Sequence, residues 1–190
     1  MKNVYKANDE SIKKAAEIIK SGGVIAIPTD TVYGLSAGIK HPEAIKRIYK
    51  IKNRPENQPL ITHIADLEDL AELTEITDTV KKLAAKFWPG ALTLVFTPEL
   101  SIRIPDNQTD LEIIRLAETP IVSTSANLSG YPNPLTAEKV YEQIGDKVDM
   151  ILDSGKCSLG IPSTLLDISQ TPAKIIRLGA ISEKELMEFL

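Results

Sequence analysis

The sequence predicts a single α/β domain over residues 1–190, built on a mixed β-sheet with helices around it. Three observations support this fold class. The chain is long enough to bury one hydrophobic core and short for two. Segments with helical periodicity alternate with strand-like segments from end to end, without an internal repeat or a low-complexity linker. Several connections are too short for a helical crossover, so some neighbouring strands must be antiparallel.

The first helix is expected from about Asp9 to Ser21, where apolar residues recur at helical spacing. Asn8 or Asp9 can cap its start, and Gly22-Gly23 stops it. A short buried strand, VIAIP (24–28), follows. The first forty residues therefore already show the alternation of helix and strand.

A loop, TDTVYGLSAG (29–38), leads to the second helix. This helix begins at His41-Pro42, because proline suits the first helical position. It ends near Lys52, because Pro55 disfavours helical geometry at the residue before it. The segment PLITHIA (59–65) then reads as the next strand.

The rest of the chain continues in the same way. A helix capped by Thr77 or Asp78 runs through Phe87 and ends at Trp88-Pro89-Gly90. The remaining predicted elements are strands at 91–96 and 101–105 joined by a turn, a helix that starts near Asn107 and Asp110, a strand at 120–127, a helix from Thr136 to Ile144, and strands at 150–153, 163–168 and 173–178.

Charge and composition exclude several classes of protein. The chain carries 26 acidic and 22 basic residues, a net charge of −4, so it is no polycation. Its one cysteine excludes an internal disulfide. Residues 1–20 lack the apolar centre of a signal peptide, and no apolar stretch approaches the ~20 residues that span a bilayer. We expect a cytoplasmic protein that does not enter a membrane.

Common cofactor and nucleophile motifs are missing. The sequence has no G-x-x-x-x-G-K-[ST] phosphate loop, no G-x-G-x-x-G after a strand and no G-x-S-x-G elbow. Two histidines and one cysteine do not make a zinc site of usual spacing. We therefore predict no protein-bound metal site.

A basic stretch closes the second predicted helix. Lys46, Arg47 and Lys50 are typical of a solvated helix face. Lys52 and Arg54 are placed beyond the helix, in a proline-bounded loop that is well suited to binding. Guanidinium and ammonium groups bind phosphate or carboxylate, but this spacing alone does not decide between a binding role and a surface role.

Two hydroxyl-rich segments follow predicted strands. Thr29, Thr31 and Tyr33 lie in the first, and the second is VSTSANLSG (122–130). The second segment lies at the carboxyl end of a strand, where parallel α/β sheets usually bind ligands. Each segment is either an ordinary hydrogen-bonded turn or one wall of a polar pocket.

Two further features are ambiguous on their own. Strand alternation places His63 on the same face as Ile61, where it is either structural or a pocket residue. The acidic run from Asp66 to Asp78 is typical of a solvated helical surface and not of a metal site.

The exact residues of these motifs and their order along the chain identify a protein family more specifically than any one motif does. GGVIAIPTDTVYGL, KIKNRPENQPL, FWPGALTLV, IRIP, VSTSANLSG, PST and RLG occur in succession. This series resembles the YrdC-like family, and most closely the threonylcarbamoyl-AMP synthases that start threonylcarbamoyladenosine modification of tRNA. The likeness runs from about residue 10 to 180. Lys52-x-Arg54 and Ser125-x-Asn127 match the K-x-R…S-x-N signature of the family.

The resemblance implies a single YrdC-like domain with a twisted mixed sheet, surrounding helices and a large basic cavity. It implies the minimal form, without the separate C-terminal domain of longer members. The implied reaction joins L-threonine, bicarbonate and ATP, carried with Mg²⁺, to give L-threonylcarbamoyladenylate and pyrophosphate. Its implied partners are downstream threonylcarbamoyl-transferase proteins, with a possible contact to tRNA.

The resemblance also implies the site residues. Lys52 and Arg54 are the expected catalytic residues. The expected L-threonine site consists of Thr31, Tyr33, His63, Arg103, Ser123 and Ser163. The expected ATP site consists of Lys52, Arg54, Gln58, Ser125, Asn127, Asn133 and Arg177. Gln58 stands where the family more often has Asn. As a loop residue, Lys52 is expected to be replaceable by Ala without harm to the fold.

Two alternatives stay open. The first is a YrdC-like module that binds double-stranded RNA without synthase activity. The second is a carbamoyl-adenylate enzyme that uses carbamoyl phosphate, like the YrdC-like segment of hydrogenase-maturation proteins. The K-x-R…S-x-N set favours the synthase over the first. The absence of accessory domains and zinc-finger cysteines from this sequence argues against the second.

Overall fold

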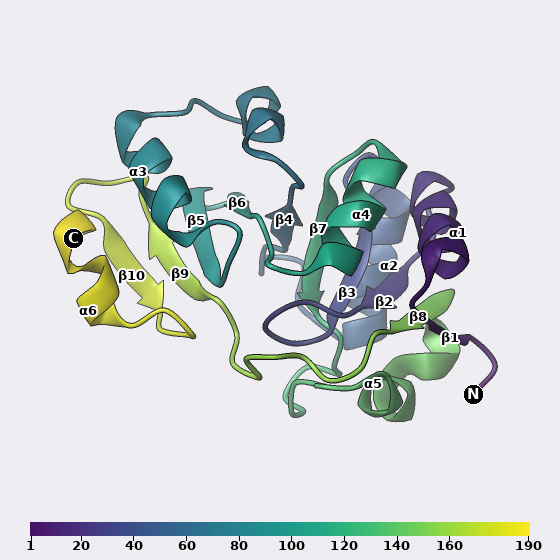
Figure 1. Ribbon diagram of the computed structural model, residues 1–190. Helices are drawn as coiled ribbons and strands as arrows, with labels where there is room; N and C mark the ends of the chain where they lie inside the picture. Colours follow the sequence, from purple (N-terminus) through teal and green to yellow (C-terminus); the bar gives the residue numbers. More distant parts are fainter.

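Ten strands form one twisted sheet in the order β1-β8-β2-β3-β7-β4-β6-β5-β9-β10 (Figure 1). A computed structural model describes all of residues 1–190. The strands are β1 (Val4–Lys6), β2 (Ile25–Ile27), β3 (Gly34–Gly38), β4 (Ile61–His63), β5 (Leu92–Thr97), β6 (Leu100–Arg103), β7 (Ile121–Ser125), β8 (Met150–Asp153), β9 (Thr164–Asp167) and β10 (Lys174–Arg177).

Six α-helices surround this sheet. They are α1 (Asp9–Lys20), α2 (Pro42–Lys52), α3 (Asp78–Phe87), α4 (Gln108–Ala117), α5 (Ala137–Ile144) and α6 (Glu183–Leu186). Short 3₁₀ helices occur at Leu67–Glu72, Gly145–Lys147 and Met187–Phe189. None of the helices combines the length and the apolar character needed to cross a lipid bilayer.

The sheet is mixed, as predicted. Strand pairs β1/β8, β2/β8, β4/β6 and β5/β9 are parallel, whereas β2/β3, β3/β7, β4/β7, β5/β6 and β9/β10 are antiparallel. The β5–β6 hairpin forms around the turn that the sequence predicted. Short connections join β2 to β3, β5 to β6 and β9 to β10, and each of these three pairs is antiparallel.

Side-chain caps set the starts of the helices. Asn8 accepts a hydrogen bond from the Ser11 backbone N–H, and Ser11 completes a capping box. The side chains of Thr77, Asn107 and Thr136 each accept from a backbone N–H in the first turn of α3, α4 and α5. These caps confirm the predicted helix starts, because each needs only residues close in sequence.

Two strands lie where the sequence did not predict them. β3 occupies Gly34–Gly38 within the predicted loop 29–38, and it lies between β2 and β7. Its sequence, GLSAG, has low strand propensity, so pairing on both sides stabilises it instead. β1 has three residues and owes its place to its partner β8, nearly 150 residues later.

Two hydrophobic cores lie on opposite faces of the sheet. A core of 25 residues packs under α1, α3 and α4, and a second core of 17 residues packs under α2 and α5. Strand β2 serves both, because Ile25 and Ile27 enter the larger core while Val24 and Ala26 enter the smaller. Alternation of side chains across the strand explains this division.

The second face of the sheet is open over β4, β6, β5 and β9. On β4, Ile61 and His63 line a cavity there, while Ile64 just beyond the strand enters the larger core. On β6, Arg103 lines the cavity while Ile102 enters the larger core. The cavity therefore occupies the space that helices fill over the other half of the sheet.

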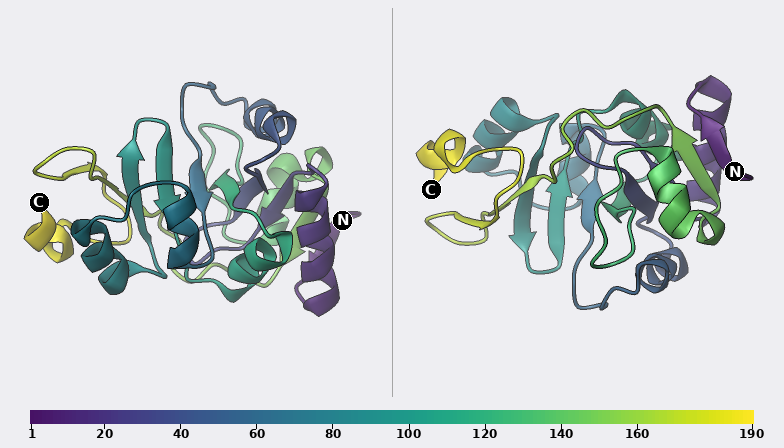
Figure 2. Two further views of the ribbon diagram at one scale, coloured as in Figure 1. Left: turned by 90° about the horizontal axis from the view of Figure 1, so that it is seen from above. Right: turned by 90° about the horizontal axis from the view of Figure 1, so that it is seen from below.

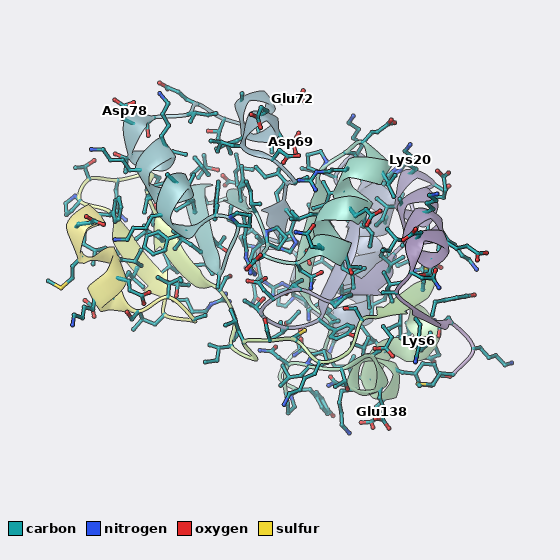
Figure 3. The ribbon with its side chains drawn as sticks, viewed as in Figure 1. Lys6, Lys20, Asp69, Glu72, Asp78 and Glu138 are labelled. Atoms are coloured by element: carbon teal, nitrogen blue, oxygen red, sulfur yellow. The ribbon has the colours of Figure 1, made fainter.

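The acidic run lies on the outside of the molecule. Asp69, Glu72 and Asp78 are labelled in Figure 3 along the edge that carries α3, and Glu72 and Asp78 are exposed. Asp66 forms an ion pair with Arg115 at 2.8 Å. The predicted solvated surface is confirmed, although its helical part is a 3₁₀ helix at Leu67–Glu72 instead of an α-helix.

Residues 154–163, here called the strap, cross from β8 in one half of the sheet to β9 in the other (Figures 1 and 2). Backbone hydrogen bonds fix the strap to the loop after β2, because Leu159 N donates to Asp30 O at 2.9 Å and Gly160 N donates to Thr31 O at 3.0 Å. Of the strap, Pro162 and Ser163 line the cavity, and these bonds fix the segment that precedes them.

Gly179 fastens the far end of the strap. A Cβ at this position would lie 2.5 Å from the Ser163 carbonyl carbon and closer still to the Pro162 carbonyl oxygen. Ala180 N donates to that same oxygen at 3.0 Å. Only glycine permits this approach of two backbone segments.

We predict that Gly179→Ala lowers the free energy of unfolding by about 3 kcal/mol, the upper range for overpacking, because both contacts are backbone atoms that cannot rotate away. Urea denaturation measures the change. Gly130→Ala is the control, since a Cβ there meets nothing within 4 Å and only the positive φ of 84° is strained. An equal or smaller loss for Gly179→Ala would contradict the proposed close approach.

Candidate functional site

The open half of the sheet contains a cavity of about 490 Å³ lined by 23 residues. Its charged lining consists of Arg54, Arg103 and Arg177, with His63 as a further titratable group and no carboxylate. Hydroxyl and amide side chains make up much of the rest. The cavity therefore offers many hydrogen-bond donors and positive charge, which suits an anionic ligand.

Ten of the thirteen predicted site residues line this one cavity. They are Thr31, Arg54, Gln58, His63, Arg103, Ser123, Ser125, Asn133, Ser163 and Arg177. The fold brings them together from four strands, β4, β6, β7 and β10, and from the loops between elements. The ligand that each of them binds remains a prediction.

Lys52 is not the loop residue that the sequence predicted. It is the last residue of α2 and is 2% exposed. Its Nζ donates to the Ser125 carbonyl oxygen, to the Asn127 carbonyl oxygen at 2.7 Å and to Asn127 Oδ1 at 3.0 Å. Burial, and then the nearby charge of Arg54, lower the pKa of Lys52 to about 7.

The helix extends to Lys52 because it ends in a left-handed C-cap at Asn53, with φ of 51°. Pro55 restricts only the residue before it, so the helix has room to include Lys52. The ammonium group consequently points behind the cavity wall and holds the loop after β7.

Asn127 and Tyr33 also lie behind the wall. The Asn127 side chain accepts from Lys52 and donates to Tyr131 O at 2.6 Å. Tyr33 is fully buried in the smaller core, and its hydroxyl donates to Gly155 O at 2.8 Å. Burial raises the pKa of Tyr33. Neither side chain lines the cavity, and the contacts that the structure gives them are structural, while their predicted ligand contacts stay predictions.

Arg103 is the most enclosed cation of the cavity. Its Nε donates to Gly90 O at 2.7 Å and its Nη1 to Thr31 Oγ1 at 3.0 Å, while its Nη2 pairs with Asp30. Burial lowers the pKa of Arg103, and the charges of Asp30 and Asp110 oppose that shift. Asp30 thus fixes one edge of the guanidinium and partly balances its charge.

His63 lies beside Arg103, because β4 and β6 pair in parallel with these two residues in register. Its Nδ1 is 3.0 Å from Asp110 Oδ2, and both residues are buried. The second oxygen of Asp110 and that of Asp30 have no hydrogen-bond partner. One end of the cavity is therefore built from a guanidinium and an imidazole, each backed by a buried carboxylate.

Two serine hydroxyls also line the cavity, and that of Ser163 accepts from Arg177. Ser123 Oγ accepts from Ser36 Oγ at 3.0 Å. Ser163 Oγ is 2.8 Å from Thr93 Oγ1. The hydroxyls of Ser36 and Thr93 therefore orient those of Ser123 and Ser163.

The other end holds cations without carboxylate partners. Arg54 donates to Gln58 O at 3.3 Å and to Pro59 O at 3.2 Å, and Arg177 donates to Ser163 O at 2.8 Å. Burial lowers the pKa of Arg177, and the charges of Arg103 and Arg54 lower it further. Arg177 is repelled by both Arg103 and Arg54, so a polyanion would be stabilised here.

Sequence reasoning missed the two buried carboxylates. Asp110 was expected only at a helix start and Asp30 only in a turn. Their partners lie 47 and 73 residues away, so no local spacing could identify the pairs. The alternation of His63 with Ile61 was the one local sign that this histidine faces the cavity, and it was correct.

Comparisons with known proteins agree with this architecture. A family model described as "Telomere recombination", covering Sua5, YciO and YrdC, matches residues 17–179. A Bacillus subtilis relative named threonylcarbamoyl-AMP synthase is 38% identical over 94% of this chain and 56% of its own length. A Methanocaldococcus jannaschii relative is 34% identical, and the match covers 96% of this chain and 94% of that protein.

A solved structure shows the same fold. The crystal structure of P. abyssi Sua5 complexed with L-threonine matches with a TM-score of 0.93 at 35% identity, over 99% of this chain and 60% of that one. The chain spans a little over half the length of the B. subtilis and P. abyssi relatives. From its sequence match and its fold alike, the chain belongs to the Sua5/YciO/YrdC family.

Proposed function

We propose that this protein synthesises L-threonylcarbamoyladenylate from L-threonine, bicarbonate and ATP with release of pyrophosphate, the first step of tRNA threonylcarbamoyladenosine modification. The observation that carries the proposal is the divided cavity. At one end Arg103 and His63 are each backed by a buried carboxylate, whereas Arg54 and Arg177 have no carboxylate partner. Relatives named threonylcarbamoyl-AMP synthase and a Sua5 complex with L-threonine support it.

The balanced end suits a zwitterionic amino acid. Arg103 presents a guanidinium for the carboxylate, and Thr31 and Ser123 supply hydroxyls. The pairing of Arg103 with Asp30 limits its free charge, so the site does not favour a strongly anionic ligand. We assign L-threonine to this end.

The unbalanced end suits the triphosphate of ATP. Arg54 and Arg177 repel each other when the cavity holds no anion, so phosphate binding would relieve that repulsion. Ser125, Asn133 and Gln58 line the same cavity and offer hydroxyl and amide groups. We assign the nucleotide to this end.

Mg²⁺ is expected to enter with ATP. The cavity lining has no carboxylate, which is the ligand this ion prefers from proteins. The residues therefore do not form a magnesium site of their own, and the ion would be held by phosphate oxygens and water. No catalytic step is assigned to it.

The chemistry requires positioning more than covalent catalysis. The threonine amine adds to the carbon of bicarbonate, and an oxygen of the resulting carbamate attacks the α-phosphate of ATP. Arg54 is placed to balance charge on the phosphates as pyrophosphate leaves. Lys52 acts from behind the wall by holding Ser125 and Asn127 in place.

The direct test is pyrophosphate release from ATP, with the nucleotide product identified by mass. We expect release only when L-threonine and bicarbonate are both present, with a threonylcarbamoyladenylate mass. Omission of either co-substrate is the matched control. Absence of release, together with salt-dependent binding of double-stranded RNA, would favour the RNA-binding alternative.

Lys52→Ala is expected to lower the free energy of unfolding by about 3 kcal/mol as well as activity, because buried oxygens of Ser125 and Asn127 lose their donor. Urea denaturation and pyrophosphate release measure the two effects. Lys50→Ala, on the partly exposed face of the same helix, is the control. Lost activity at unchanged stability would mean that the ammonium acts on the substrate.

Arg54→Ala and Arg103→Lys should separate the two ends of the cavity. A charged hydrogen bond contributes about 1.5–3 kcal/mol, so each loss should raise one KM by about tenfold or more. Steady-state kinetics should show the ATP KM rising for Arg54→Ala and the threonine KM for Arg103→Lys. Equal effects on both substrates in either variant would show that the ends are assigned wrongly.

A further inference from the structure

Asp110 is a buried carboxylate that does not line the cavity. It is 0% exposed, and its Oδ2 lies 3.0 Å from Nδ1 of His63. Its Oδ1 has no hydrogen-bond partner. A charged or polar group buried in this way is costly, so its one contact needs an explanation.

The start of helix α4 holds Asp110 in place. The Asp110 backbone N–H donates to the capping side chain of Asn107 at 3.2 Å, which fixes the residue in the first turn. The helix N-terminus and the charge of Arg103 both place positive potential near this carboxylate. Local structure thus holds a negative group directly behind His63.

A carboxylate can only accept a hydrogen bond, so the proton between the two residues belongs on Nδ1 of His63. Neutral imidazole then carries a lone pair on Nε2, which has no protein partner although His63 lines the cavity. With its proton on Nδ1, His63 therefore offers Nε2 to the cavity as a proton acceptor.

We propose that Asp110 is a positioning residue that keeps His63 in the Nδ1–H tautomer, so that Nε2 accepts a proton from the ammonium group of the amino-acid substrate. This inference rests on the proposed function, because it assigns the amino acid to this end of the cavity. It adds the group that makes the substrate nucleophilic, which the cationic lining alone does not supply.

The proton balance is complete. The ammonium group transfers one proton to Nε2, and Asp110 stabilises the imidazolium that forms. The free amine and bicarbonate give the carbamate and one water, as the C–N bond forms and the bond from carbon to the hydroxyl oxygen breaks. The imidazolium returns its proton to solvent.

Asp110→Asn tests the role, because Asn keeps the shape but donates as well as accepts, and so allows the Nε2–H tautomer. We expect kcat for pyrophosphate release to fall about 100-fold, the usual scale for general-base catalysis, with the ATP KM within twofold of wild type. Asp30→Asn is the matched control, since it alters the other buried carboxylate. It should raise the threonine KM and leave the His63 tautomer unchanged.

Ring-nitrogen NMR gives a readout that is independent of synthase activity. The chain has two histidines, so His41→Gln assigns the signals of His63. In the wild type we expect the proton of the neutral ring on Nδ1, and in Asp110→Asn a shift toward Nε2. An Nε2–H tautomer in the wild type, or protons on both nitrogens at the assay pH, would overturn the proposal, even if Asp110→Asn does not fold.

The kinetic and spectroscopic results separate two failures. If the wild type releases no pyrophosphate, the proposed function fails, while the NMR spectra still test the orientation of the pair. If Asp110→Asn lowers kcat but keeps the Nδ1–H tautomer, or leaves kcat within twofold, the positioning role is wrong.

Discussion

The buried ammonium of Lys52 joins the end of α2 to the loop after β7, and the cavity depends on this joint. Three oxygens from Ser125 and Asn127 converge on one Nζ, and the Lys52 carbonyl in turn accepts from Ser129 N at 2.9 Å. Arg54, two residues further on, faces the cavity. The two signature pairs therefore each have one structural member behind the wall and one member in it.

Charge is distributed unevenly around that joint. Arg103 contacts the carboxylate of Asp30, and His63 contacts that of Asp110. Arg54 and Arg177 have only backbone carbonyls and a hydroxyl as partners. The difference follows from position, because the first group lies deep on the sheet and the second lies on its margin. A guanidinium stays charged when buried, so Arg103 needs a carboxylate partner, whereas burial lowers the pKa of Lys52 and a marginal arginine is hydrated. The fold thus explains why one cavity has two chemically different ends.

The sequence predicted what depends on neighbours along the chain. The helix caps at Thr77 and Asn107 are local, and both were confirmed. The predicted helix end near Lys52 was confirmed, but Lys52 was wrongly placed in the loop beyond it, because the partners that bury its side chain lie more than 70 residues away. β3 was missed because its stability comes from strands on both sides and not from its own residues. The buried carboxylates were missed for the same reason, since their meaning lies in partners far along the chain.

The hydrogen bonds between the strap and the loop after β2 join segments that are well over a hundred residues apart. Asp30 and Thr31 belong to the first sixth of the chain, and Leu159 and Gly160 to the last fifth. During synthesis the backbone groups of Asp30 and Thr31 stay hydrated until the ribosome has made the strap that binds them. Such non-local closure slows folding, because the entropy of a long loop is lost before any contact forms. The binding cavity is therefore among the last parts of the molecule to form, and an incomplete nascent chain has no enclosed site.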